Sequence, residues 1–232
     1  MKLSNRRIIK GAKIILENEV IKDHVIVFTD KIEEILLESE ASDIEGQWIH
    51  HEGFISPGFI DIHIHGAAGA DTMDCSVDAL RTIANALVET GTTGFLATTM
   101  TMEQSVIENS IDTIRRFMEI QKNIELQSKE CDIGEKVRAT GARVLGVHLE
   151  GPFINPLYKG AQNDKYIQKP TLSWVEKYLD VIKMITLAPE MDENFQFIGA
   201  LKDKDVVLSM GHTACDFETA CAAFDEGMDH VT

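Results

Sequence analysis

The pattern of apolar and polar positions divides the chain into two regions with different periods. Residues 1 to about 54 carry short apolar runs at positions 8–9, 13–16 and 24–28, separated by polar turns such as the one at 29–31. Short runs of this kind, broken by turn residues, predict strands. We therefore expect a small β-rich domain over residues 1–54.

From residue 55 onward, apolar strands alternate with amphipathic helices. Such alternation is typical of βα units that build a parallel sheet. A closed eight-stranded βα barrel usually takes roughly 250 residues, so residues 55–232 are too few for one. The predicted strands span residues 59–65, 94–98, 144–150, 184–188 and 206–210, and a sixth is expected to start at Val231.

Helix signals fall between these strands. Ser76 is placed to cap a helix whose apolar residues recur at helical spacing, and Gly91 is placed to end it. Between residues 120 and 142 the chain is polar and charged, which predicts an extended helix end and a surface loop. Two further pairs have the spacing of a capping box: Thr101 with Gln104, and Ser173 with Glu176.

The charge of the chain narrows the class of ligand. It has 22 basic and 38 acidic residues, for a formal net charge of -16, and 44% of its residues are hydrophobic. Such a charge repels nucleic-acid phosphates and anionic membrane surfaces. We expect a folded protein that acts on a small molecule, with a local basic pocket if that molecule is an anion.

The cysteines and the N-terminus indicate a cytoplasmic protein. No CxxC pair occurs, and the first apolar run is broken by charged residues, so it suits neither a signal peptide nor a transmembrane helix. We expect reduced thiols at all four cysteines, which are Cys75, Cys131, Cys215 and Cys221.

A pair of histidines, His63 and His65, lies near the end of a predicted strand in the segment PGFIDIHIHG. Side chains two positions apart on a strand project from the same face, so these two imidazoles could bind one cation. Two unconnected strand histidines remain an open alternative for this pair alone.

Two later segments add further candidate ligands. In VHLEGP, Glu150 lies at the C-terminal tip of a strand, where catalytic residues of a βα barrel gather. His148, two residues deeper, is better explained as a hydrogen-bonded residue of the barrel interior than as a metal ligand. In SMGHT, a histidine follows another apolar strand. Nitrogen and oxygen ligands from three strand ends suit Zn²⁺ or a similar divalent ion: His63, His65, Glu150 and His212.

The segments PGFIDIHIHG, GVHLEGPFINPLYKGAQN, ITLAPE and SMGHT, in this order, resemble the family of N-acetylglucosamine-6-phosphate deacetylases within the amidohydrolase superfamily. The resemblance covers residues 1–232. It implies an α/β fold, namely a (β/α)₈ TIM-type barrel with a small β-sandwich built from both chain ends. Residues 55–232 would then be the N-terminal part of the barrel, with five to six strand-helix units.

The resemblance also implies an activity. The expected reaction is metal-dependent hydrolysis of the acetamide of N-acetyl-D-glucosamine 6-phosphate to D-glucosamine 6-phosphate and acetate, in amino-sugar catabolism. One or two divalent ions, with zinc expected, would serve as cofactor. The intact enzyme is expected to be a homo-oligomer, a dimer or larger.

Individual residues match the family by position. Glu150 and His212 match metal ligands, and the presence of both histidines of the HxH pair resembles the two-metal branch. Ala161 and Gln162 match a substrate-contacting pair, although many members carry His where this chain has Gln162. Lys159 is expected to offer a donor to an anionic sugar, with a solvated loop lysine as the alternative.

The family pattern continues past Thr232 with a segment that holds another histidine ligand, the phosphate contacts and the catalytic aspartate. We therefore expect that aspartate beyond Thr232, and we expect the 232-residue chain alone to be inactive. Within the chain, His230 is out of register with the family's ligand. Asp216 and Asp225 are assigned to the start and the exposed face of a helix.

Two alternatives remain. One is a dihydroorotase- or hydantoinase-like enzyme, which would need a carboxylated lysine, and Lys183 stands nearest the required position. Acetate release against dihydroorotate ring opening distinguishes this alternative. The other is a non-catalytic fragment, which the coding DNA just past Thr232 would test.

Overall fold

The structure, a computed structural model, describes residues 6–127 and 140–232. The chain forms two compact units, Met1–Gly58 and Phe59–Thr232. Cys131 and much of the predicted loop at 120–142 lie outside the described residues. Among the helices of the described ranges, none combines the length and the apolar character that crossing a membrane requires.

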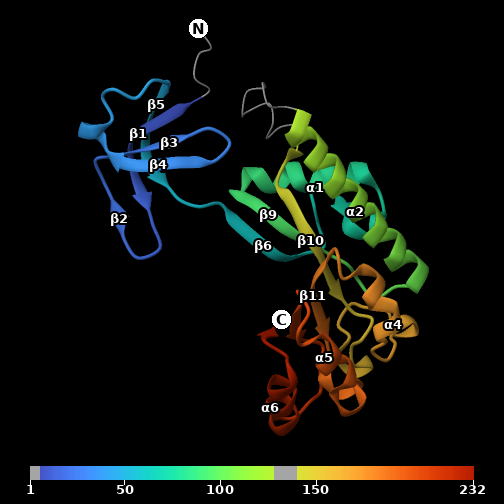
Figure 1. Cartoon of the computed structure of the whole chain (residues 1–232). Coiled ribbons are helices and arrows are strands. Elements are labelled where there is room, and N and C mark those ends of the chain that lie inside the picture. Colours follow the sequence, from blue (N-terminus) through green and yellow to red (C-terminus); the bar gives the residue numbers. More distant parts are fainter. Residues whose placement is uncertain (1–5, 128–139) are drawn as a thin grey trace. The chain divides into compact units, whose positions relative to one another are not determined.

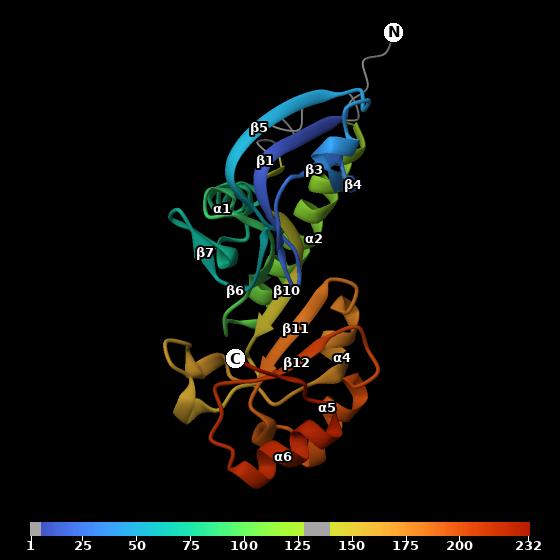
Figure 2. The same ribbon diagram turned by 90° about the vertical axis from the view of Figure 1, so that its left-hand side faces the viewer.

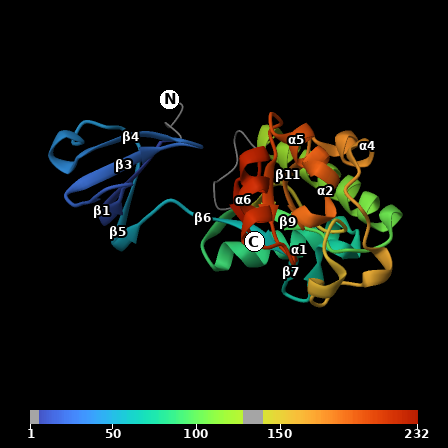
Figure 3. The ribbon, with the colours of Figure 1, turned by 90° about the horizontal axis from the view of Figure 1, so that it is seen from below.

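The first unit is a five-stranded sheet, drawn in blue to cyan in Figure 3. The central strand pairs with three others, antiparallel to two of them and parallel to the last strand of the unit. A small apolar core of Ile8, Val25, Val27 and Ala41 holds the sheet together. The elements are β1 (Arg7–Ile15), β2 (Val20–Ile21), β3 (His24–Phe28), β4 (Ile32–Leu37), η1 (Glu38–Glu40) and β5 (Gln47–Ile55).

The apolar run predicted at 8–9 and all but the last residue of the run at 13–16 are parts of one strand, β1. The register with β5 shifts between Lys10 and Ala12, and Gly11 between them has φ +85°. A side chain at Gly11 would place its Cβ 2.6 Å from Cε1 of His50. The positive φ favours glycine here, and the register shift lets the strand continue through the polar break.

The second unit is a six-stranded parallel sheet in the order β13-β12-β11-β10-β9-β6. Figures 1 and 2 show the strands side by side and the helices that connect them. The sheet is a curled half-barrel, which confirms the predicted fold class. Its strands are β6 (Phe59–Ile64), β9 (Thr92–Thr98), β10 (Arg143–Glu150), β11 (Ile182–Leu187), β12 (Val207–Met210) and β13 (His230–Val231), with a small β7–β8 hairpin (Gly66–Ala67, Ala70–Asp71).

Helices link successive strands of the half-barrel, and buried apolar residues fill the space between them and the sheet. Among the largest are Ile83, Phe95, Ile107 and Phe153, the last of which makes edge contacts with Trp174. The helices are α1 (Val77–Glu89), α2 (Gln104–Gln127), α4 (Leu172–Val175), α5 (Gln196–Leu201) and α6 (Phe217–Glu226). The short 3₁₀ turns are η2 (Thr72–Asp74), η3 (Pro156–Tyr158), η4 (Asp164–Tyr166), η5 (Glu176–Tyr178), η6 (Pro189–Met191) and η7 (Glu193–Phe195).

One predicted helix cap is confirmed and two are wrong. Ser76 is the N-cap of α1, and its hydroxyl accepts from the backbone N–H of Asp78. Thr101 does not cap α2, which begins three residues later; its own N–H donates to the side chain of Gln162 instead. Ser173 lies inside α4, whose N-cap residue is Thr171. The helix predicted to start at Thr101 begins later, because the N–H of Thr101 bonds to a distant loop instead of to Gln104. The spacing of residues in the sequence did not reveal this contact.

The Ser76 cap makes a stability prediction. Ser76→Ala should lower the free energy of unfolding of the second unit by about 1 kcal/mol, because one N–H of the first turn of α1 loses its acceptor. Chemical denaturation followed by helical circular dichroism measures this change. Ser76→Asp, which keeps an acceptor, should be near wild type. Ser105→Ala, at an exposed position in the first turn of α2, should change stability by less than about 0.5 kcal/mol. Equal losses for Ser76→Ala and Ser105→Ala would contradict the assignment.

Candidate metal centre

The HxH segment lies where the ladder between β6 and β9 breaks. The register shifts between Asp61 and Ile64, so backbone groups of β6 need other partners there. Side chains supply them: the N–H of Ile64 donates to Oγ1 of Thr98 at 2.9 Å, and the N–H of His63 donates to Oδ1 of Asp61 at 3.0 Å. These bonds hold the end of β6 while leaving both imidazoles directed toward the end of β10.

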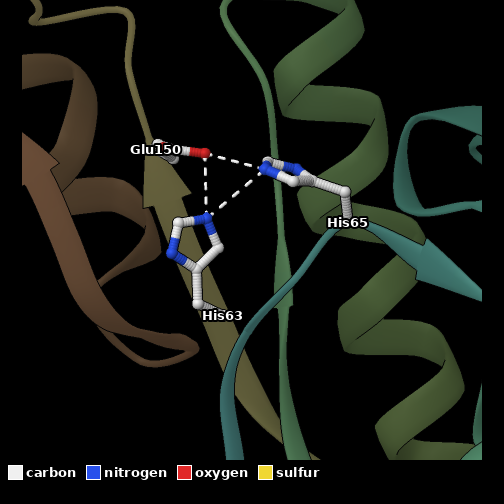
Figure 4. A group of neighbouring side chains, drawn as sticks. All are labelled: His63, His65 and Glu150. Carbon is white, nitrogen blue, oxygen red and sulfur yellow. Dashed lines mark hydrogen bonds and ion pairs between the residues drawn. The ribbon is translucent and has the colours of Figure 1, made fainter. Parts of the chain in front are cut away.

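His63, His65 and Glu150 converge from the C-terminal ends of β6 and β10, with His65 just past the end of β6 (Figure 4). Oε2 of Glu150 lies 2.8 Å from Nε2 of His65 and 3.2 Å from Nε2 of His63. The two imidazole Nε2 atoms are 3.4 Å apart. These three residues are a group that could hold a metal ion.

His212 approaches the other oxygen of the same carboxylate. Its Nε2 lies 2.9 Å from Oε1 of Glu150, so that carboxylate stands between the HxH pair and His212. The side chain of Glu150 is only 5% exposed, whereas the three imidazoles are 24–34% exposed. The structure therefore brings together all four residues that the sequence analysis proposed as ligands; their binding of a metal stays a prediction.

The spacing of the donor atoms fits a divalent cation. Ligands at about 2.1 Å from an ion in a tetrahedral arrangement would stand roughly 3.4 Å apart. Among the donors of His63, His65 and Glu150 the distances are 2.8 to 3.4 Å, and Nε2 of His212 lies 2.9 Å from the other oxygen of Glu150. Only a small outward movement would admit an ion of this size.

The hydrogen bonds of His212 give independent support. Its Nδ1 lies 2.8 Å from the backbone oxygen of Tyr158, which can only accept, so Nδ1 carries the proton. In the neutral ring Nε2 then presents a lone pair. That lone pair suits a cation or the side-chain NH₂ of Gln162, 3.4 Å away. In the doubly protonated ring, Nε2 instead donates to Oε1 of Glu150 at 2.9 Å.

The electrostatics of Glu150 match a carboxylate that stays ionised. Burial by itself raises the pKa of Glu150, but hydrogen bonds from His65 and His212, together with the nearby His63, lower it to about 2. The hydrogen bond to Glu150 in turn raises the pKa of His65 above its usual value. An ionised acceptor at the centre of three imidazoles is the charge that a cation site requires.

His148 is fully buried behind the cluster. Its Nδ1 donates to the backbone oxygen of Ile62 at 3.0 Å, and its Nε2 accepts from Oγ1 of Thr186 at 2.7 Å. Its ring also makes an edge contact with His63, at a centroid distance of 4.8 Å. The prediction of a hydrogen-bonded interior residue is confirmed, because both ring nitrogens are occupied away from the cluster.

The loop after β10 carries the predicted substrate residues. Gln162 is 4% exposed, and its Oε1 accepts from the N–H of Thr101 at 2.8 Å, which directs its NH₂ toward His212. Ala161 beside it is exposed. Nζ of Lys159 donates to the backbone oxygen of Gln162 at 3.2 Å and lies 3.6 Å from Oδ1 of Asp164. The ammonium is therefore engaged within its own loop.

Other candidates lie outside the cluster. His230 bonds to Oγ of Ser209 through Nδ1, and Asp216 is the N-cap of α6. Lys183 stands near the start of β11 and pairs with Asp205 at 2.6 Å, so it does not reach the cluster at the strand ends. A pocket of about 470 Å³ is lined by α2 and the starts of β10 and β11, at the opposite end of β10 from Glu150.

Sequence analysis missed three residues that organise the cluster. Thr98 and Thr186, each at or near the end of a strand, bond the backbone of β6 and the ring of His148. Glu190, within the quoted segment ITLAPE, accepts hydrogen bonds from the turn that follows His212. Their positions at or just after the C-terminal ends of apolar strands were the only local signal, and many residues of these types share it.

Comparison with known proteins gives one family match. Residues 54–232 match the family described as the amidohydrolase family. Among curated proteins, N-acetylglucosamine-6-phosphate deacetylase of Bacillus subtilis (strain 168) is 36% identical over 231 residues, which cover 97% of this chain and 55% of that protein. N-acetylgalactosamine-6-phosphate deacetylase of Escherichia coli O157:H7 is 28% identical over 230 residues, covering 96% of this chain and 54% of that protein.

Two solved structures are similar over almost the whole chain. The crystal structure of N-acetylglucosamine-6-phosphate deacetylase from Pasteurella multocida matches with a TM-score of 0.78 and 25% identity, covering 97% of this chain and 56% of that one. The enzyme of the same name from Thermotoga maritima matches with a TM-score of 0.66 and 28% identity, covering 95% and 53%. The chain spans about half the length of the curated relatives it matches.

The burial of His148 predicts a pH dependence of stability in the metal-free chain. Burial, together with His63, lowers the pKa of His148 to about 4 from 6.5, so the unfolded chain binds the extra proton first as the pH falls. Stability from this residue is complete above pH 6.5 and is lost between about pH 6.5 and 4, by roughly 3 kcal/mol.

Denaturant titrations with chelator present, at several pH values, measure this loss. His148→Gln should flatten the decline between pH 6.5 and 4, whereas His51→Gln, at an exposed position, should leave it unchanged. The raised pKa of His65 makes stability fall as the pH rises above 6.5, so His65 does not cause the decline between pH 6.5 and 4. The difference between wild type and His148→Gln in that range therefore reports on His148. Parallel curves for wild type and His148→Gln would contradict the account.

Proposed function

The chain belongs to the amidohydrolase family, and we propose that it carries the metal-binding part of an enzyme that hydrolyses the acetamide of N-acetyl-D-glucosamine 6-phosphate. The products would be D-glucosamine 6-phosphate and acetate. The observation that carries this proposal is the convergence of the Glu150 carboxylate with three imidazoles at the strand ends. The names of the similar proteins support the substrate class.

His63, His65, Glu150 and His212 are the proposed metal ligands, and zinc is the proposed metal. Mixed imidazole and carboxylate donors at this spacing suit Zn²⁺. When bound, the cation would polarise an amide carbonyl and acidify a water molecule toward a pKa of about 7. Oε2 of Glu150 faces His63 and His65, and Oε1 faces His212. The carboxylate could therefore bind a single ion or one ion on each side.

The residues of the chain itself have separable roles. Glu150 supplies the buried negative charge, and His148 holds the backbone of β6 through Ile62, so that His63 keeps its orientation. Gln162 is proposed to contact the substrate together with Ala161, because its NH₂ lies beside His212 at the mouth of the cluster. The proposed general acid and base, an aspartate, would come from a later part of the whole protein.

Several features of the whole protein remain proposals. We propose cytoplasmic location and a homo-oligomer, a dimer or larger, for the intact enzyme. The boundary between residues 54 and 55, with a sandwich completed by a later segment, also stays a prediction. The lysine-bridged alternative loses support, because Lys183 pairs with Asp205 near the start of its strand.

The metal role of Glu150 predicts a change in metal binding. Glu150→Gln should weaken Zn²⁺ binding by more than about 100-fold, since loss of a ligand should cost at least as much as loss of a residue that supports one. Competition with a chromogenic chelator, with metal content measured on the same samples, gives the affinity and stoichiometry.

The matched control is Glu176→Gln, an exposed carboxylate of the same unit, which should bind metal as wild type does. Acetate release by the protein expressed from its whole gene should fall with Glu150→Gln, and ring opening of dihydroorotate should be absent. N-acetyl-D-galactosamine 6-phosphate should be assayed in parallel, because a similar protein acts on it by name. Wild-type metal affinity in Glu150→Gln would remove Glu150 from the site.

The position of Gln162 predicts an effect on turnover. Gln162→Ala should lower kcat/KM for the sugar phosphate roughly tenfold or more, because the buried N–H of Thr101 loses its acceptor and the loop loses its contact to the cluster. Gln168→Ala, on the same loop, is the control. Kinetics of Gln162→Ala that match those of Gln168→Ala would exclude Gln162 from the site.

A further inference from the structure

His212 lies in a turn that its own backbone does not stabilise. The turn joins β12 to α6, and His212 has φ 50°, in the left-handed region that non-glycine residues rarely adopt. Two backbone hydrogen bonds anchor it from outside: Gly211 N–H donates to Leu187 O at 3.1 Å, and Asn155 N–H donates to His212 O at 2.9 Å. A conformation of this kind persists only where the surroundings hold it.

Glu190 makes three hydrogen bonds around this turn from the short η6 segment after β11. Its Oε1 accepts from the N–H of Ala214 at 2.6 Å and from Nδ2 of Asn155 at 2.9 Å. Its Oε2 accepts from the hydroxyl of Thr213 at 2.5 Å. Hydrogen bonds to an ionised acceptor are stronger than neutral ones, so one carboxylate ties together the two loops that meet at His212.

The second loop fixes the imidazole ring. Oδ1 of Asn155 accepts from the N–H of Leu157 at 2.9 Å, which begins the η3 turn. The last residue of that turn, Tyr158, offers its backbone oxygen to Nδ1 of His212 at 2.8 Å. Glu190 thus acts on the backbone of His212 through Ala214 and Thr213, and on its ring through Asn155.

Helix capping does not account for this arrangement. The N-cap of α6 is Asp216, whose own side chain accepts from the N–H of Thr219 at 2.8 Å. The N–H of Ala214 precedes the helix, so Glu190 satisfies the turn and not the helix start.

We propose that Glu190 is a positioning residue of the metal centre: its carboxylate holds the His212 turn so that Nε2 of His212 faces Oε1 of Glu150. This inference rests on the proposed role of His212 as a ligand. Partners that orient a metal-binding histidine typically change metal affinity by about 10- to 100-fold when they are removed.

The test is a double-mutant cycle on Co²⁺ affinity, read from the visible absorption of the bound ion, in the 232-residue chain. Glu190→Ala should weaken Co²⁺ binding roughly 10-fold or more and shift the absorption band, because the geometry of one ligand changes. Glu190→Gln, which keeps one acceptor oxygen, should lie between Glu190→Ala and wild type. In a His212→Ala background, Glu190→Ala should have no further effect. Glu193→Ala, an exposed carboxylate on the next turn, is the control and should bind as wild type.

The outcomes separate the two proposals. If His212→Ala leaves Co²⁺ affinity unchanged, His212 is not a ligand and the positioning role of Glu190 fails with it. If His212→Ala weakens binding and Glu190→Ala does not, only the role of Glu190 is overturned. If Glu190→Ala weakens binding equally in both backgrounds, or lowers the helical circular dichroism, it acts on the fold in general and the inference is wrong.

Discussion

One buried carboxylate, Glu150, constrains the rest of the second unit. Its two oxygens face three imidazoles from different parts of the chain, and its side chain is only 5% exposed. An ionised group with so little access to water must be compensated by hydrogen bonds and positive charge. The surrounding structure, from the end of β6 to the turn after β12, supplies that compensation.

The parallel sheet provides this arrangement because the carboxyl ends of its strands meet at one edge. β6 and β10 are not neighbours, since β9 lies between them, yet His148 reaches from β10 to the backbone oxygen of Ile62 in β6. This bond lies where the register between β6 and β9 shifts, between Asp61 and Ile64. The cluster therefore depends on side-chain hydrogen bonds inside the half-barrel as much as on the strand pairing.

Much of the fold could be predicted from local pattern. Strand positions follow from apolar runs bounded by turns, and the HxH pair shares a face because strand residues two apart do so. Capping was predicted well at Ser76 and wrongly at Thr101, whose N–H is taken by Gln162 from a loop 61 residues away. Contacts of that range leave no periodic trace in the sequence.

The same limit applies to the candidate site. The four proposed ligands can be recognised in the sequence from their side-chain chemistry. The residues that orient them cannot be recognised in this way. Thr98, Thr186 and Glu190 act through side-chain hydrogen bonds between elements distant in the chain, and ordinary residues of their types occur throughout it. Only the three-dimensional arrangement shows which threonine or glutamate meets a ligand-bearing strand.

The most direct test of the account is to locate the metal. Anomalous diffraction at the zinc edge from crystals of the Zn²⁺-loaded chain would place each ion without reference to activity. The account predicts a zinc peak at about 2.0–2.2 Å from Nε2 of His63, Nε2 of His65 and an oxygen of Glu150. A peak bound elsewhere on the chain, with these three side chains left in mutual contact, would contradict it.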